Sequence, residues 1–148
     1  MAKSIFETLE RTGCPANLLQ IEITEKFALE AEAETGIIKQ MRALEKEGIV
    51  FVLDDFGTGY GSFRYMQLLP ISILKIDQTF IHSLKSKKNQ QLVNGMVQLG
   101  KSMNLTVVAE GVETEEQMQF LTSIGCDFIQ GYFVSKPSST EEISSLLL

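Results

Sequence analysis

The chain has 148 residues and a net charge of −6, with 44% hydrophobic and 22% charged residues, which is typical of a globular domain with one core. The negative net charge argues against binding to nucleic-acid polymers, which requires a basic surface. No apolar run in the sequence approaches the roughly 20 residues of a membrane span. The amino terminus lacks a signal-peptide core, and the widely separated Cys14 and Cys126 form no CxxC pair. We therefore expect a cytoplasmic protein without a metal–thiolate site.

Two periodicities alternate along the chain. A helical stretch at Ile5–Arg11 precedes the first of five short apolar runs, which are rich in β-branched residues, as buried parallel strands are. We predict strands at Leu18–Thr24, Ile49–Asp54, Ile73–Asp77, Thr106–Glu110 and Asp127–Tyr132. Strand and helix repeated in this way favour right-handed βαβ units and a parallel sheet.

Helical patterns separate the predicted strands. Apolar residues recur at helical spacing over Ile37–Leu44, before Gly48, and over Leu92–Met103. A shorter helical turn is expected over Phe63–Leu68. Two pairs have the spacing of a capping box, in which a hydroxyl and a side chain three residues later cap a helix reciprocally. These are Thr114 with Gln117, in a helix ended by Gly125, and Ser139 with Glu142, before a C-terminal segment at Ile143–Leu148.

About five parallel strands alternating with helices indicate an α/β fold, either a partial TIM-like (β/α) barrel or a doubly wound sheet. A closed barrel needs eight strands and about 250 residues, whereas a doubly wound sheet can stop at five. The Gly-rich phosphate loop of many doubly wound folds does not follow the first strand; Glu22-Ile-Thr-Glu25 stands there instead. We see no domain boundary within residues 1–148.

Polar groups stand at the carboxyl end of every predicted strand, where α/β folds bind ligands. In chain order they are Glu22 and Glu25; Asp54 and Asp55, followed by Gly57 and Gly59 in the loop; Lys75 and Asp77; Glu110 and Glu113; and Gln130. Each has a structural explanation of its own: a solvated turn or helix cap, an ion pair at a strand edge, a helix-dipole carboxylate or a buried amide. Their convergence on one rim favours a functional site.

The residue types indicate the chemistry of that rim. Asp54 and Asp55 repel each other at the end of a buried strand unless a cation neutralises them, and hard divalent ions take carboxylate oxygens. Gly57 and Gly59 permit a bend and a close backbone approach to phosphate. Lys75, inside an apolar strand, suits the orientation of a water or the neutralisation of a phosphoryl oxygen. We assign no catalytic role to the single histidine, His82.

These motifs also occur in a familiar order. They are Glu22-Ile-Thr-Glu25, Asp54-Asp-Phe-Gly-Thr-Gly-Tyr60, Leu74-Lys-Ile-Asp77, Ala109-Glu-Gly-Val-Glu113, Gln130-Gly-Tyr132 and Lys136-Pro137. Together they resemble the EAL domain over nearly the whole chain. The resemblance implies a modified TIM barrel that hydrolyses cyclic di-GMP to the linear dinucleotide with Mg²⁺ or Mn²⁺, through in-line attack on one phosphodiester by a water that metal activates.

The resemblance also implies a role for each matching residue. Glu22 and Asp54 are similar to ligands of the first metal, and Asp55 to a ligand of the second. Lys75 resembles the lysine that contacts the catalytic water, and Glu110 the carboxylate that faces the metal centre. Glu113 resembles the glutamate that anchors the Asp-Phe-Gly-Thr-Gly loop, and Gln130 the site glutamine on the last strand.

The sequence departs from the family pattern in what it lacks. Gly61 stands where the family usually has Ser, and no Glu-Ala-Leu signature occurs in the chain. The family's asparagine ligand and substrate-contacting arginine belong to strands that are absent here, so about three of eight barrel strands are missing. We expect residues 1–148 to be the C-terminal part of an EAL domain whose parent is an enzyme. Alone, the chain would be inactive or very slow, and a second copy would cover its edges.

Two other interpretations stay open. The chain is a non-catalytic module that binds cyclic di-GMP or another protein, or it is an unrelated metal-dependent hydrolase on a flavodoxin-like sheet. The missing strands favour the first of these for the isolated chain, and the count of five strands suits the second.

Overall fold

A computed structural model describes residues 1–59 and 63–146. The described residues form a five-stranded parallel sheet of β1 (Gln20–Thr24), β2 (Val50–Phe56), β3 (Ile71–Ile76), β4 (Thr106–Glu110) and β5 (Phe128–Gln130). The strands lie in sequence order. A doubly wound sheet reverses its strand order at a switch point, so the flavodoxin-like alternative is wrong. The predicted partial barrel is confirmed.

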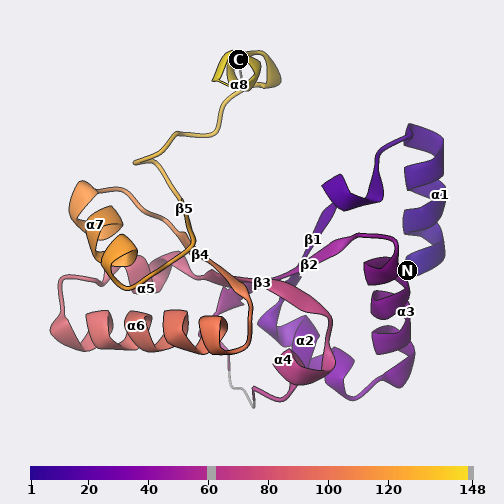
Figure 1. Ribbon diagram of the computed structural model, residues 1–148, viewed down its shortest axis with the longest axis horizontal. Coiled ribbons are helices and arrows are strands. Elements are labelled where there is room, and N and C mark those ends of the chain that lie inside the picture. The colour runs from indigo at the N-terminus through magenta and orange to yellow at the C-terminus, as the bar shows by residue number, and fades with distance from the viewer. Residues whose placement is uncertain (60–62, 147–148) are drawn as a thin grey trace.

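Helices cover the outer side of this curved sheet (Figure 1). They are α1 (Ala2–Thr12), α2 (Glu25–Glu32), α3 (Thr35–Lys46), α4 (Tyr65–Leu68), α5 (Gln78–His82), α6 (Lys87–Ser102) and α7 (Glu115–Ser123). The last helix, α8 (Thr140–Leu146), stands apart at the end of an extended segment in Figure 1. Both predicted capping boxes are confirmed, because Thr114 and Gln117, and likewise Ser139 and Glu142, bond each other's backbone amides.

Two short helices were not predicted, and both begin where a strand ends. Glu25 opens α2 directly after β1, with the Thr24 hydroxyl accepting the Phe27 amide at 3.3 Å. Asp77, which we had placed in a strand, is the N-cap of α5. The first strand is also shorter than predicted, because Leu18 belongs to a 3₁₀ turn over Ala16–Leu18 and is 70% exposed.

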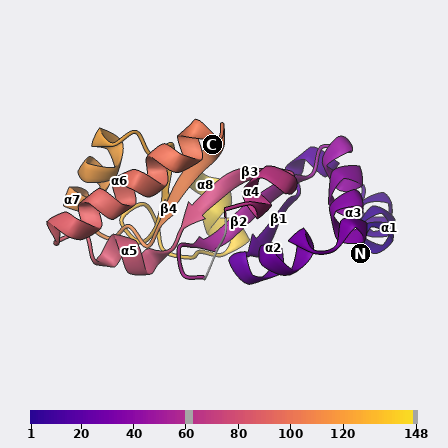
Figure 2. The same ribbon diagram turned by 90° about the horizontal axis from the view of Figure 1, so that it is seen from below.

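The hydrophobic core lies between the sheet and the helices. Figure 2 shows α6 and α7 at one end of the molecule and α1 and α3 at the other, with β1, β2 and β3 between them. Fully buried members include Phe51, Leu53, Leu74, Ile76, Met41, Leu44, Val93 and Val97. On the strands these are the residues of one alternating set, as a sheet covered by helices on that face requires. The other set therefore faces the inside of the incomplete barrel.

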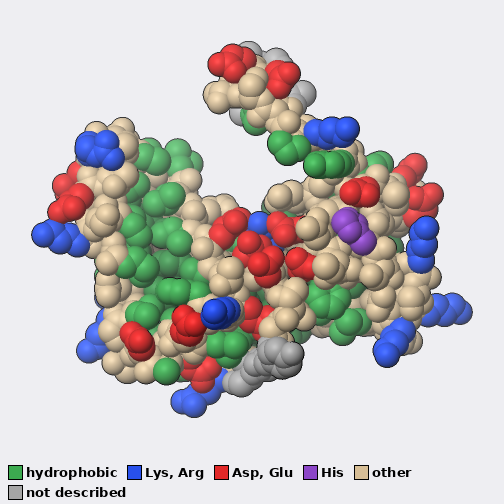
Figure 3. Space-filling view, turned by 180° about the vertical axis from the view of Figure 1, so that it is seen from behind, with side chains coloured by type: hydrophobic (Ala, Val, Ile, Leu, Met, Phe, Trp, Pro, Cys, Tyr) green, Lys and Arg blue, Asp and Glu red, His purple; other side chains and the backbone are tan. Residues whose placement is uncertain are grey.

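The two outer strands, β1 and β5, each pair with a single neighbour among the described residues. Figure 3 shows acidic side chains gathered near the middle of the open face, with a broad apolar area beside them. Within residues 1–59 and 63–146, none of the helices has the length and apolar character needed to cross a bilayer. Tyr60 and Gly61, which we considered as part of the loop motif, lie outside the described residues.

Candidate metal centre

The alternation of the strands explains why one face of the sheet carries the polar residues. Glu22 pairs with Val52, Val52 with Ile73, and Lys75 with Val108. Paired residues in a sheet point to the same side, as do residues two apart on one strand. Four predicted site residues consequently share the inner face of the sheet: Glu22, Asp54, Lys75 and Glu110.

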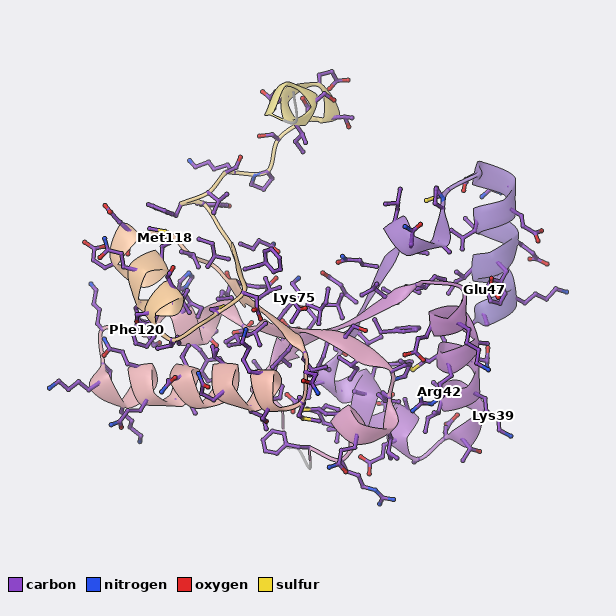
Figure 4. All side chains as sticks on the ribbon, in the orientation of Figure 1. Lys39, Arg42, Glu47, Lys75, Met118 and Phe120 are labelled. Atoms are coloured by element: carbon purple, nitrogen blue, oxygen red, sulfur yellow. The ribbon has the colours of Figure 1, made fainter. Side chains whose placement is uncertain are left out.

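Lys75 lies on β3 at the middle of the sheet (Figure 4) and is 8% exposed. Its Nζ lies 2.6 Å from Glu110 Oε1, 2.8 Å from Glu22 Oε1 and 3.5 Å from Asp54 Oδ1. Burial opposes the charged form, but the hydrogen bonds to Glu110 and Glu22 outweigh it and raise the pKa of Lys75. The ammonium therefore stays charged at neutral pH and holds three carboxylates together.

Asp54 and Asp55 reach the same point despite being adjacent. Pairing of β2 with β3 is irregular between Leu53 and Phe56, and Asp55 has a left-handed φ of 55°, which Asp tolerates better than most residues. As a result, one oxygen each from Asp54, Asp55 and Glu110 lie within 4.8 Å of one another. The chain turns at Asp55 itself, before the glycines to which we had attributed a bend, and this turn brings the two carboxylates together.

The electrostatics of this cluster fit a divalent cation. Asp54 Oδ1 is buried and accepts no hydrogen bond from the residues that the structure describes, which is costly for a carboxylate oxygen; the Lys75 ammonium lies 3.5 Å from it. Burial, followed by the charges of Asp54 and Asp77, raises the pKa of Asp55. A hard cation among the three carboxylates relieves both penalties. Glu22 lies outside this group; it contacts Lys75, and its side chain is 53% exposed.

The loop after β2 is anchored by Glu25, which we had placed among the polar residues at the strand ends without assigning it a role. Glu25 is 4% exposed, and its Oε2 accepts the amides of Gly57 at 3.3 Å and Gly59 at 3.0 Å. Its Oε1 accepts the buried hydroxyl of Tyr65 at 2.9 Å. Gly57 has φ +98°, and a Cβ on Gly59 would lie 2.9 Å from the Glu25 carboxyl carbon. The left-handed φ of Gly57 and the lack of a side chain on Gly59 therefore let the loop approach Glu25 closely.

The anchoring role expected for Glu113 is accordingly corrected. Gly111, with φ +71°, turns the chain after β4 and carries Glu113 toward α7. There its amide donates to Gln117 Oε1 at 2.7 Å, and its half-exposed carboxylate lies 3.7 Å from His82 Nε2. One signal for Glu25 was present in the sequence. Residues three apart on a strand point to opposite faces, so Glu22 and Glu25 could not both lie on the inner face of the sheet.

Gln130 ends β5 directly opposite Glu110. Together they line a depression of about 270 Å³, which also contains Gln78, Gly111, Glu113, Gly131 and Tyr132. The depression adjoins the carboxylate cluster through Glu110. Gln130 and Glu113 thus line the same depression beside the carboxylate cluster.

A curved parallel sheet in sequence order, covered by helices on one face, defines a protein of the βα-barrel class, and its inner rim carries a cluster of carboxylates that could hold a metal ion. The EAL domain model matches residues 1–137, and the chain belongs to the EAL domain family.

Among its relatives, the chain is 39% identical over 145 residues to the bifunctional diguanylate cyclase/cyclic di-GMP phosphodiesterase MucR of Pseudomonas aeruginosa. That match covers 97% of this chain but 21% of MucR. The solved MucR phosphodiesterase in complex with c-di-GMP superposes with a TM-score of 0.88 at 38% identity, over 95% of this chain and 57% of that one. The EAL domain of Mycobacterium smegmatis DcpA gives a TM-score of 0.89 at 31% identity, over 99% and 65%.

Proposed function

We propose that this chain supplies the metal-binding rim of a phosphodiesterase domain that acts on cyclic di-GMP. The observation that carries the proposal is the convergence of Asp54, Asp55 and Glu110 beside Lys75. Asp54 Oδ1 is buried there without a hydrogen bond from any described residue. The similarity to MucR, solved in complex with c-di-GMP, supports the substrate.

Within this proposal, Asp54, Asp55 and Glu110 hold the cation, and Glu22 supplies a further carboxylate. Bound Mg²⁺ or Mn²⁺ would polarise a phosphoryl oxygen and lower the pKa of water. Lys75 keeps its charge, so it can orient the attacking water or neutralise a phosphoryl oxygen. Gln130 and Glu113 present an amide and a carboxylate to the rest of the nucleotide from the depression beside Glu110.

We further propose that residues 1–148 are the C-terminal part of the domain and that the isolated chain turns over very slowly or not at all. The resemblance assigns one metal ligand, an asparagine ligand and an arginine to strands that this sequence does not contain. The single-sided pairing of β1 and β5 supports association with a second copy. Light scattering should then give the mass of a dimer, and a purely monomeric mass would contradict the association. The cytoplasm is the compartment we propose, in keeping with two unpaired cysteines.

Calorimetric titration with cyclic di-GMP, with and without Mg²⁺, tests the function alongside chromatography of the linear dinucleotide. We expect metal-dependent binding with little turnover. Asp54→Asn should abolish the dependence on metal, whereas Glu7→Gln, which removes the same charge from an exposed position on α1, should not. Turnover at an ordinary enzymatic rate of 1–10³ s⁻¹ would contradict the inactivity. Failure to bind metal or nucleotide would contradict the proposed function.

A second candidate is a non-catalytic module that senses cyclic di-GMP. The incomplete sheet favours it for this chain alone, and the intact carboxylate cluster favours catalysis in a complete domain. The two differ in one measurement. Adding a chain with the missing strands should restore turnover in the enzyme fragment and leave the sensor inactive.

A further inference from the structure

We propose that Gln117 is a positioning residue of the nucleotide site: it holds the backbone of Glu113 and so fixes where the Glu113 carboxylate enters the depression beside Glu110. The inference rests on the proposed function, in which Glu113 faces the nucleotide from that depression. It assigns to Gln117 a role beyond the cap of α7.

Glu113 depends on support from its backbone, because its side chain has little support of its own. The carboxylate is 53% exposed, and its ion pair with the half-exposed His82, 3.7 Å away, is of the kind that contributes little to stability. On the amino-terminal side, the chain is fixed at Val112, which is fully buried. The Val112 amide donates to Gln130 O at 3.1 Å, and the Val112 carbonyl accepts the Phe133 amide at 2.9 Å. Support on the other side of Glu113 comes from α7.

Gln117 provides that support with both ends of its side-chain amide. Its Oε1 accepts the Glu113 amide at 2.7 Å and the Thr114 amide at 3.0 Å. A capping box needs only the second of these bonds. The Nε2 group of Gln117 donates to Ile81 O at 3.2 Å, in the last turn of α5. The side chain therefore ties the backbone of Glu113 to a second helix.

The presence of glutamine at this position agrees with a positioning role. Glutamate caps a helix in the same way and suits the positive end of the helix dipole, and Glu115 and Glu116 already stand in the first turn of α7. Of the two residue types, only glutamine can also donate to Ile81 O. Gln117 can thus hold the loop and be held by α5 at the same time.

Amide hydrogen exchange of the full chain, measured by NMR, tests the positioning without any ligand. The Glu113 amide should exchange about tenfold faster in Gln117→Met than in the wild type, because methionine keeps the length of the side chain but is a poor acceptor. In Gln117→Glu, which retains the acceptor, the Glu113 amide should stay protected. Thr114→Ala is the matched control. It removes the hydroxyl that accepts the Gln117 backbone amide at 3.3 Å, and so weakens the same cap, but it leaves the bond to Glu113.

Calorimetric titration with cyclic di-GMP and Mg²⁺ tests the consequence for binding. Gln117→Met should weaken nucleotide binding about 3- to 10-fold, which is the cost of ordering a freed side chain and its loop. Thr114→Ala should bind the nucleotide as the wild type does, although both substitutions lower the melting temperature. Mn²⁺ affinity without nucleotide should be the same in all variants. In a Glu113→Ala background, Gln117→Met should have no further effect on nucleotide affinity, because Gln117 acts through Glu113.

Unchanged exchange of the Glu113 amide in Gln117→Met would overturn the positioning role. Equal losses of nucleotide affinity in Gln117→Met and Thr114→Ala would also overturn it, as would an undiminished effect of Gln117→Met in the Glu113→Ala background. If the wild type binds no nucleotide while the exchange result stands, the proposed function fails and the support of Glu113 by Gln117 is upheld.

Discussion

Replacement of Glu25 by alanine should destabilise the chain, because three donors converge on this one carboxylate. Two are loop amides, from Gly57 and Gly59, and the third is the hydroxyl of Tyr65. Tyr65 is fully buried, and within the described residues its hydroxyl has no other acceptor. The substitution therefore leaves that hydroxyl without a partner, while opening of the loop can return the two amides to water.

The magnitude follows from these contacts. A hydrogen bond to a charged group contributes about 1.5–3 kcal/mol, and a stranded buried donor costs about 1–3 kcal/mol. Because the amides can rehydrate, we expect Glu25→Ala to lower the free energy of unfolding by about 2–4 kcal/mol. Tyr65→Phe removes the hydroxyl but leaves Glu25 with both amides, and should cost about 1 kcal/mol. In the double variant no donor is stranded, so the effects should fall short of their sum by about 1–2 kcal/mol.

Urea unfolding of the four members of this cycle measures the coupling. Glu30→Ala, an exposed change on the same helix, is the matched control and should stay within about 0.5 kcal/mol. Additivity of the two site substitutions within about 0.5 kcal/mol would refute the proposed link between Glu25 and Tyr65. A cost for Glu25→Ala no larger than that of the control would refute its role as the loop anchor.

Three further predictions concern charged and titrating groups. Lys75→Met should cost about 2–4 kcal/mol because it strands buried carboxylates, and added Mn²⁺ should raise the melting temperature of this variant more than that of the wild type. Asp127→Ala should lower the free energy of unfolding by about 1–2 kcal/mol, because Asp127 accepts hydrogen bonds from both Lys101 and the Val107 amide. Lys101→Met removes only the exposed ion pair and should lower it by under about 1 kcal/mol, as measured by urea unfolding. Burial and Glu25 raise the pKa of Tyr65, so the unfolded chain loses the phenolic proton at a lower pH than the folded chain, and the free energy of unfolding should fall above about pH 10. Tyr65→Phe should make this fall less steep in unfolding curves measured between pH 8 and 11. An unchanged slope would contradict the prediction.

The inner-face residues were predictable because strand alternation and parallel pairing act together. A charged residue inside an apolar run marks the face that the helices do not cover, and this rule is sufficient for Glu22, Lys75 and Glu110. Gln130 follows from its position opposite Glu110. The sequence signal is strong for these residues because each interrupts a hydrophobic pattern.

Glu25 and Asp77 were expected at strand ends, but their contacts escaped prediction because a strand there passes directly into a helix. Glu25 and Asp77 each follow a strand with no turn residue between, so no glycine or proline marked the change of period. The direction of the Asp55 side chain was equally unreadable, because it depends on a left-handed φ at a non-glycine residue. That conformation accompanies the irregular pairing of β2 with β3. The register between two strands is a long-range feature that local sequence patterns do not contain.

The incomplete sheet and the site are linked through Glu22. Its strand, β1, lies at an open edge, and its side chain is 53% exposed, against 18% for Glu110 and 22% for Asp54. Solvent screens an exposed ion pair more strongly than a buried one. Of the three ion pairs that Lys75 makes, the one with Glu22 therefore contributes least to stability. A strand added beside β1 would exclude water from Glu22 and strengthen that contact. Closure of the sheet and completion of the metal centre therefore favour each other, because both act on the same inner face of β1.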